Sequence, residues 1–270
     1  MILIQLTDLH VRPHGLAAMR ACETNMLTER ALRAVRDFRP RPDALLITGD
    51  LTNNGLVAEY ENLADMLGRL IDLPTYVIPG NHDNRANLRA TLGHLRGVLS
   101  DPEFVQYAIE DLPVRLLMLD TLIQGETDGE LCGRRMAWLE RTLAAEPNKP
   151  TIIAMHHPSF LCGIGHLDRI ILRDPAGFEA VVAGHRQVRR IICGHHHRPI
   201  TTNVAQAIAS VGPGVAHIVE LDLFSDTPGL WMLEPPAFHV HAWIDGAGLV
   251  SHMGFVDRYP GPYPFVSDPV

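Results

Sequence analysis

Five short clusters of metal-ligand side chains occur between residues 7 and 197. In chain order, the clusters are Thr7-Asp8-Leu9-His10, Gly49-Asp50, Gly80-Asn81-His82-Asp83, His156-His157 and Gly194-His195-His196-His197. They offer carboxylates, an amide carbonyl and imidazoles but no thiolate, and this donor set suits ions such as Mn, Fe, Co or Zn. The clusters therefore predict a metal site with oxygen and nitrogen ligands.

Each cluster directly follows a short apolar run with the composition of a buried strand. The runs before the clusters are Ile2–Leu6, Ala44–Thr48, Tyr76–Ile78, Thr151–Met155 and Val188–Cys193, and Val114–Leu119 is a sixth run of the same kind. In an open α/β sheet, ligands bind beyond the carboxyl ends of the strands, so we expect the five clusters to converge. The alternative, in which these polar side chains merely satisfy one another in the core, does not explain five clusters in order at five strand ends.

Two of the clusters place a ligand type at every second residue. Asp8 and His10 form one such pair, and His195 and His197 form another. Because side chains alternate along an extended segment, the members of each pair would point the same way and His196 would point the opposite way. The glycines of the second, third and fifth clusters permit sharp turns after the strands. We expect these turns to aim the ligands into one pocket.

Amphipathic helices are predicted between the apolar runs. Met26–Phe38 carries an apolar stripe at spacings of three and four residues, and the prolines at positions 40 and 42 stop it. Similar stripes over residues 63–70 and 136–143 predict two further helices, each followed by a proline. Strands that alternate with helices in this way indicate an α/β fold.

The pattern changes from about residue 205 onward. Short runs at His217–Leu221, Leu230–Leu233 and Phe238–Ile244 are separated by Pro, Gly and Asp, which predicts hairpins, and residues 259–265 form an extended, Pro-rich aromatic tail. We expect one domain over residues 1–270, with a core to about residue 200 and a small β-rich C-terminal cap beyond it. Hairpin edges and apolar faces can pair between copies, so we also expect a homo-oligomer, a dimer or larger.

Composition limits the class of protein. The chain has 270 residues, of which 46% are hydrophobic, which is ordinary for a packed globular core. A formal charge of −8 argues against capture of long nucleic acids, whose binding depends on Lys and Arg.

The four cysteines, Cys22, Cys132, Cys162 and Cys193, lack a CxxC pair and are expected to be reduced thiols in the interior. The opening residues lack a leader pattern and no apolar run could span a bilayer, so we expect a cytoplasmic protein.

The order and spacing of the five clusters resemble the calcineurin-like metallophosphoesterase superfamily, whose pattern is D-x-H, G-D, G-N-H-D/E, a His after a strand, and G-H-x-H. Every part of that pattern has a counterpart here.

Within the superfamily, the chain is most similar to bacterial class III cyclic nucleotide phosphodiesterases and the related glycerophosphodiesterases. That similarity rests on the Thr-Asp-Leu-His start, Gly129-Glu-Leu, Trp138-Leu139-Glu140, His156-His157-Pro158 and Pro213-Gly-Val-Ala-His217. Ser159 departs from it, because a second proline is common there. The resemblance implies a four-layer α/β/β/α sandwich.

The resemblance also implies a dinuclear centre. One ion would be held by Asp8, His10, Asp50 and His197, and the other by Asp50, Asn81, His156 and His195, with Asp50 as the bridge. The two ions would be Fe, Mn, Zn or Co. The implied reaction is the hydrolysis of a small phosphodiester by a metal-bound hydroxide, with 3′,5′-cyclic AMP slightly favoured over a glycerophosphodiester. A phosphomonoesterase or a promiscuous phosphoesterase is the alternative, and a non-catalytic scaffold of the same fold is a more distant one.

The remaining site residues have open roles. His82 and Asn81 are the expected catalytic residues, and His82 would contact the phosphate or protonate the leaving alkoxide, unless it only orients its neighbours. His217 and His196 are expected to contact substrate. The alternatives are a structural histidine in a strand for His217 and a solvated side chain for His196. Arg12 would meet a phosphate or base, or form a surface ion pair.

Two further polar side chains are assigned supporting roles outside the ligand set. His157 is expected to hydrogen-bond in support of its neighbour His156, and Asp83 to orient the Asn81-His82 turn.

Overall fold

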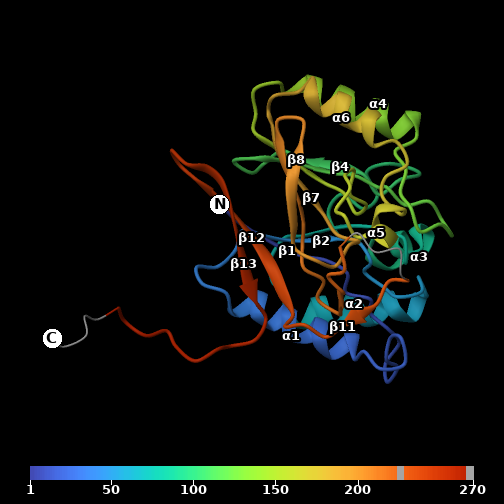
Figure 1. Ribbon diagram of the computed structural model, residues 1–270, viewed down its shortest axis with the longest axis vertical. Helices are drawn as coiled ribbons and strands as arrows, with labels where there is room; N and C mark the ends of the chain where they lie inside the picture. Colours follow the sequence, from blue (N-terminus) through green and yellow to red (C-terminus); the bar gives the residue numbers. More distant parts are fainter. Residues whose placement is uncertain (224–227, 266–270) are drawn as a thin grey trace.

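Two sheets packed face to face form the centre of the molecule, and helices cover their outer faces (Figure 1). The computed structural model describes residues 1–223 and 228–265. The first sheet has the order β13-β12-β1-β2-β3, with bounds Gly248–Phe255, Ala237–Ile244, Ile2–Leu6, Ala44–Thr48 and Thr75–Ile78. The second has the order β4-β5-β6-β7-β9-β8, with bounds Tyr107–Ile109, Arg115–Met118, Thr151–Ala154, Val188–Cys193, Ala207–Val211 and Ile200–Val204.

The helices divide between the two outer faces. The first sheet packs on α1, α2 and α3, which span Thr24–Asp37, Val57–Leu70 and Arg85–Leu92. The second packs on α4 and α6, which span Gly133–Ala145 and Pro175–Ala183. A short helix, α5 (Gly165–Asp168), and an isolated strand pair, β10 (Ile218–Val219) and β11 (Trp231–Met232), complete the described elements.

Alternation along the central strands explains why four layers form. In β5, Leu116 belongs to the core between the sheets, whereas the next residue, Leu117, belongs to the core under α4 and α6. The same switch occurs in β6 between Ile152 and Ile153, because successive side chains of a strand point to opposite faces. A strand that is apolar on both faces must be covered on both, so sheet packs on sheet and helix packs on sheet.

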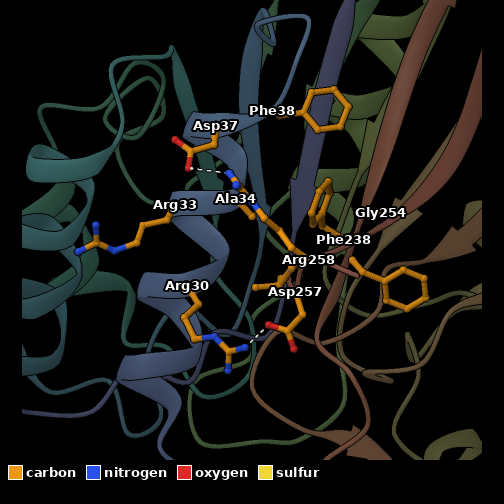
Figure 2. Close-up of a pocket in the computed structure, with 11 residues that line it drawn as sticks. Arg30, Arg33, Ala34, Asp37, Phe38, Phe238, Gly254, Asp257 and Arg258 are labelled. Carbon is orange, nitrogen blue, oxygen red and sulfur yellow. Dashed lines mark hydrogen bonds and ion pairs between the residues drawn. The ribbon is translucent and has the colours of Figure 1, made fainter. Parts of the chain in front are cut away.

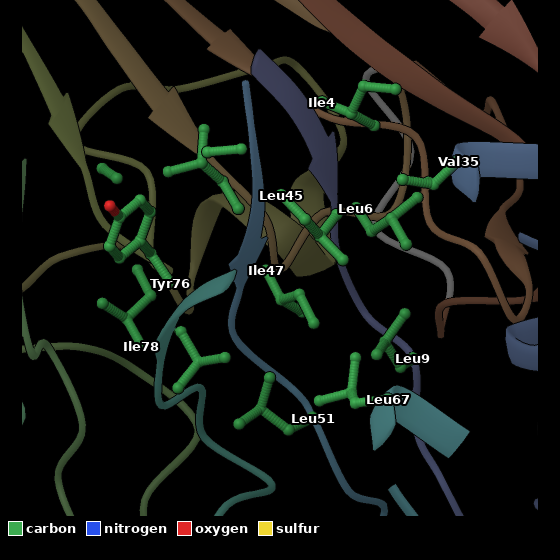
Figure 3. Packing of buried hydrophobic residues seen from close by; sticks show 14 of the residues in the cluster. Ile4, Leu6, Leu9, Val35, Leu45, Ile47, Leu51, Leu67, Tyr76 and Ile78 are labelled. Atoms are coloured by element: carbon green, nitrogen blue, oxygen red, sulfur yellow. The ribbon is translucent and has the colours of Figure 1, made fainter. Parts of the chain in front are cut away.

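The larger core joins the first sheet to its helices. Figure 3 shows part of it, where side chains of β1, β2 and β3 meet Val35 of α1 and Leu67 of α2. All of these side chains are buried. At about 25 cal/mol for each Å² of apolar surface removed from water, each such side chain stabilises the fold by roughly 1.5–3 kcal/mol. The strands are therefore held rigidly enough to fix the loops that follow them.

Most predicted elements are confirmed. The six apolar runs form β1, β2, β3, β5, β6 and β7, with ends that agree to within one residue, and the three helical stripes form α1, α2 and α4. The sequence reasoning missed α3, α5 and α6 and the strands β4, β8, β9 and β13. The four-layer arrangement of sheets flanked by helices agrees with the expected fold.

The C-terminal segment contributes to two parts of the structure. Strand β12 inserts beside β1, antiparallel to it, and β13 pairs with β12 to form the edge of the first sheet. Residues on both sides of position 200 therefore share one sheet. The tail over residues 259–265 contains no helix or strand and leads away from the body, with Tyr263 exposed (Figure 1). Among the described helices, none has both the length and the apolar character that a membrane span requires.

Candidate metal centre

The five clusters meet beyond the carboxyl ends of β1, β2, β3, β6 and β7, as expected. Parallel pairing sets this convergence, because Leu6 of β1 pairs with Ile47 of β2, and Thr48 pairs with Ile78 of β3. In the second sheet, Ala154 of β6 pairs with Ile192 of β7. Because the paired strands end at matching positions, the loops that follow them lie at the same edge of the sheet.

Four side chains form a first group of donors. The potential ligand atoms of Asp8, His10, Asp50 and His197 all lie within 4.8 Å of one another, and all four residues are buried. Nε2 of His10 lies 3.2 Å from Nε2 of His197 and 3.5 Å from Oδ2 of Asp50. Nε2 of His197 lies 3.4 Å from Oδ1 of Asp8. Two carboxylates and two imidazoles at this spacing suit a divalent ion.

A second group surrounds the other oxygen of Asp50. Nε2 of His156 lies 3.4 Å from Oδ1 of Asp50 and 3.1 Å from Oδ1 of Asn81. Nδ1 of His195 lies 2.9 Å from the same Asn81 oxygen. Asp50 thus directs one carboxylate oxygen toward each group, which is the arrangement that a bridging ligand between two ions would need.

Backbone carbonyls hold the far nitrogen of three of these imidazoles. Nδ1 of His156 lies 2.8 Å from the carbonyl of Thr48, and Nδ1 of His197 lies 2.9 Å from the carbonyl of His217. Nε2 of His195 lies 3.0 Å from the carbonyl of Ile170. A nitrogen that donates to a carbonyl must carry the hydrogen, so the other nitrogen presents its lone pair to the centre. The rings are therefore held in the tautomers that bind metal.

The backbone of the ligand loops is left-handed, and the expectation of extended pairs is wrong. Positive φ angles occur at Asp8 (56°), His10 (47°), Asp50 (47°), His195 (71°) and His197 (57°). For a residue with a Cβ, this conformation costs on the order of 1 kcal/mol. Each loop must turn sharply as soon as its strand ends, and the left-handed turns bring both side chains of a pair to the centre. Such strain commonly accompanies functional sites.

Two glycines leave room for ligand atoms. A Cβ on Gly80 would lie 2.3 Å from Oδ1 of Asp50 and 2.6 Å from Nε2 of His156. A Cβ on Gly194 would lie 2.1 Å from Oγ1 of Thr7. Neither glycine has a positive φ, so lack of a side chain, rather than backbone freedom, is what these positions require.

Burial and charge set the protonation of the ligands. Burial lowers the pKa of His10 and His195 far below the usual range, so both rings are neutral, which is the form that binds metal. Burial opposes ionisation of Asp50, but His156 and His82 hold its pKa well below the usual range. Burial raises the pKa of Asp8, and a carboxylate in that position gains most from a nearby cation. The donor set therefore fits two positive ions.

His82 lies at the exposed side of the centre. Its Nδ1 is 2.8 Å from the carbonyl of Asn53, and its ring packs edge-on against His10 with centroids 4.7 Å apart. Its backbone N–H donates to Oδ1 of Asp50 at 2.9 Å. Burial lowers the pKa of His82, but the charge of Asp50, the hydrogen bond to the Asn53 carbonyl and the charge of Asp83 together raise it overall.

His217 and His196 occupy different surroundings. The His217 ring centroid lies 4.2 Å from that of His197 and 5.1 Å from that of His10, so His217 is beside the first group. Burial, followed by the charge of His197, lowers the pKa of His217 to about 2. His196 is fully buried, with its ring centroid 5.4 Å from that of His195.

Arg12, His157 and Asp83 each have defined partners. Arg12 forms an ion pair with Glu59 at 2.8 Å, but Glu59 is buried, so this is not the surface ion pair of the alternative. His157 is buried beside His156 and hydrogen-bonds to Thr121 through Nδ1 at 2.7 Å. The Asp83 carboxylate accepts hydrogen bonds from the backbone N–H groups of residues 51, 52 and 80. Asp83 therefore holds the Gly80–Asp83 loop against the loop that follows Asp50.

One residue beside the centre was missed by sequence reasoning. Trp231 lies with its ring centroid 5.8 Å from that of His217, at an interplanar angle of 71°. The run Leu230–Leu233 predicted a strand here but gave no sign that it would reach the centre. Only the pairing of β10 with β11 brings Trp231 close.

A surface pocket of about 490 Å³ lies elsewhere, between α1 and the last residues of β13 (Figure 2). Arg30 pairs with Asp257 there, and Arg258 lies 3.7 Å from Asp37. None of its lining residues belongs to the five clusters.

Comparisons with known proteins show the family and the fold of this chain. The sequence pattern of the family described as calcineurin-like phosphoesterase matches residues 1–199. A protein of Arcobacter nitrofigilis named probable glycerophosphodiester phosphodiesterase GpdQ is 33% identical over 99% of this chain and 98% of its own length. The 3′,5′-cyclic adenosine monophosphate phosphodiesterase CpdA of Vibrio vulnificus is 30% identical over 73% of this chain and 69% of its own. A dimetal phosphatase from Danio rerio shares the fold, with a TM-score of 0.65 at 15% identity over 95% of this chain and 99% of that one.

Proposed function

Because this chain belongs to the calcineurin-like phosphoesterase family, a family of metal-dependent hydrolases, we propose that it hydrolyses small phosphodiesters at the centre formed by its five loops. It is a phosphodiesterase like the relatives that align with most of its length. The observation that carries the proposal is the position of Asp50. One of its carboxylate oxygens faces His10 and the other faces His156, which supports two adjacent metal sites sharing one ligand.

The proposed ligand sets follow the two donor groups. One ion would be held by Asp8, His10, Asp50 and His197, and the other by Asp50, Asn81, His156 and His195. When bound, the ions supply the acidity that makes water a nucleophile near neutral pH and the positive charge that neutralises phosphate oxygens. Oxygen and nitrogen donors accept Fe, Mn, Zn or Co, and the cellular supply decides among them.

His82 would act on the leaving group. Its Nδ1 donates to the carbonyl of Asn53, so in the protonated ring Nε2 carries the second proton, which is the one that a leaving alkoxide needs. Although burial opposes it, the combined effect of Asp50, the Asn53 carbonyl and Asp83 raises the pKa of His82, which keeps the ring protonated nearer neutral pH. The same nitrogen could donate a hydrogen bond to a phosphate oxygen before the transfer. In both roles the residue touches the substrate, so it is catalytic.

Two substrate classes compete for this site. The sequence resemblance slightly favours 3′,5′-cyclic AMP, and the CpdA relatives support that class. Glycerophosphodiesters are the second candidate, because the GpdQ relatives align with almost the whole chain, C-terminal segment included. A small substrate is common to both.

A cytoplasmic location and a homo-oligomer of two or more chains are further parts of this proposal.

A turnover panel tests the proposal. Metal-reconstituted protein would be given 3′,5′-cyclic AMP, glycerophosphoethanolamine, bis(p-nitrophenyl) phosphate and the monoester p-nitrophenyl phosphate. We expect the diesters to be hydrolysed faster than the monoester, and Asn81→Ala to be inactive. A clear preference for the monoester would favour the phosphomonoesterase alternative, and no turnover with both metal sites filled would favour the scaffold.

A further inference from the structure

The strand pair β10–β11 stands directly beside the proposed metal ligands. In its register, Trp231 lies opposite Val219, so the two side chains share one face of the pair. His217, the residue just before β10, has its ring against those of His10 and His197. The strand pair therefore begins next to a residue that contacts two of the proposed metal ligands.

Two contacts hold this strand pair in place. Arg198, which directly follows His197, donates from Nε to the carbonyl of Val219 at 2.5 Å and pairs with Glu234 just beyond β11. On the other side, Gly229 packs so tightly against α5 that a Cβ there would lie 2.3 Å from Nε2 of His166. Trp231 is thus anchored to the loop that carries His197.

The indole of Trp231 combines this fixed position with access to solvent. Its ring centroid is 5.8 Å from that of His217, which is itself 4.2 Å from that of His197. Trp231 is 37% exposed, whereas the ligands beneath it are buried. A large, partly exposed aromatic surface therefore lies two ring contacts away from the proposed metal ligand His197.

We propose that Trp231 is a specificity-determining residue on which the nucleobase of a 3′,5′-cyclic nucleotide stacks. This inference rests on the proposed phosphodiesterase function and selects one of its two substrate classes. Nδ1 of His217 supports it, because that buried nitrogen has no hydrogen-bond partner in the described ranges, and the His217 ring contacts both His197 and the indole. A sugar hydroxyl would satisfy it.

The chemistry of the contact favours a nucleobase over a quaternary ammonium group. Stacking of a base on one aromatic side chain strengthens binding by about 5- to 150-fold, whereas a cation on a single exposed ring gains only about two- to fivefold. Tight binding of a quaternary ammonium group uses a cage of several aromatic rings. In the portion of the chain that the structure describes, Trp231 is the only ring other than histidine in contact with His217.

Steady-state kinetics of Trp231→Ala and Trp231→Phe test the inference. The substrates would be 3′,5′-cyclic AMP, glycerophosphoethanolamine and glycerophosphocholine, with metal content measured for each protein. We expect Trp231→Ala to raise KM for cyclic AMP by about tenfold, a loss within the range of one stacking contact, and to change kcat less. Both glycerophosphodiesters should stay within about twofold of wild type, and Trp231→Phe should recover most of the lost affinity.

Binding of the product gives a readout that does not depend on turnover. We expect 5′-AMP to quench tryptophan emission of the metal-loaded protein, whereas glycerol 3-phosphate, a matched monoester without a base, should not. The quench should be lost in Trp231→Phe. It should persist in Trp243→Phe, a matched control on β12.

Three results would overturn the inference. Equal losses on all three substrates would make Trp231 a structural residue, and unchanged kinetics would remove it from the binding site. A loss confined to glycerophosphocholine would assign the indole to a quaternary ammonium group instead. Failure of the proposed function would look different, because wild type would then hydrolyse none of these diesters.

Discussion

The Nε2 atoms of His10 and His197 face each other at 3.2 Å, although the two residues are 187 positions apart in the sequence. The other nitrogen of His197 is engaged with the carbonyl of His217, so its Nε2 presents a lone pair to His10. Two buried nitrogens at this distance need a shared proton or cation between them. An ion bound between them would satisfy both nitrogens, and we expect such an ion to stabilise the fold.

Metal removal should therefore lower stability as well as abolish activity. An ion at about 100 times its Kd adds about 2.7 kcal/mol to the free energy of unfolding, which for a chain of this size raises Tm by roughly 5–10 °C. Calorimetry of chelated and Mn²⁺-reconstituted protein measures the shift. Asp50→Asn, which weakens both donor groups, should show a much smaller shift, and an equal shift in that variant would contradict the shared role of Asp50.

Replacing His82 should impair catalysis without releasing metal. Since proton transfer to the leaving group contributes about 10²–10⁴-fold, His82→Ala should lower kcat on cyclic AMP by that order. The effect should be smaller on bis(p-nitrophenyl) phosphate, whose leaving group needs no proton. Metal analysis of the variant is the control. Full kcat with full metal content would remove His82 from catalysis.

Gly80→Ala should disrupt the centre by steric overlap. Its Cβ would lie 2.3 Å from Oδ1 of Asp50 and 2.6 Å from Nε2 of His156, so these donors must move apart. Misplacement by about 1 Å costs about a hundredfold in rate, and we expect that loss together with a reduced metal content.

Gly68→Ala is the matched control for this change. Gly68 lies within α2, and a Cβ there meets nothing within 4 Å. Alanine should stabilise the helix by about 1 kcal/mol and leave the rate unchanged. If Gly80→Ala behaved like Gly68→Ala in metal content and rate, the tight packing around Asp50 would be refuted.

Acid should destabilise the fold through His239. Burial, followed by the charge of Arg190, lowers the pKa of this histidine to about 4, whereas in the unfolded chain it lies near 6.5. As pH falls from about 6.5 toward 4, the unfolded state takes up a proton that the folded state does not, so stability falls. The loss should reach at most about 3 kcal/mol.

Urea unfolding at several pH values measures this effect. His239→Gln should flatten the pH dependence between pH 4 and 6.5 relative to wild type, while His252→Gln, at an exposed position on the neighbouring strand, should leave it unchanged. If wild type and His239→Gln lost the same unfolding free energy between pH 6.5 and 4, His239 would not be the source of the acid destabilisation.

The amino-acid sequence by itself determined the central strands, three of the helices and the identity of the donors. Local patterns were sufficient because a run such as Val188–Cys193 has the length and composition of a buried strand wherever it is placed. The ligand types after each run, together with the rule that strand ends share an edge, predicted convergence. The family resemblance added the pairing of donors into two groups.

Only the tertiary structure decided how the donors are held and what surrounds them. The left-handed backbone at Asp8 and His195, the space beside Gly80 and the carbonyl contact of His197 all depend on segments far away in the sequence. The same is true of β12, which pairs with β1, and of Trp231, which reaches His217 because β11 pairs with β10. Periodicity records which face of an element is buried, but not which distant element buries it, because that choice is made by the packing of the whole chain.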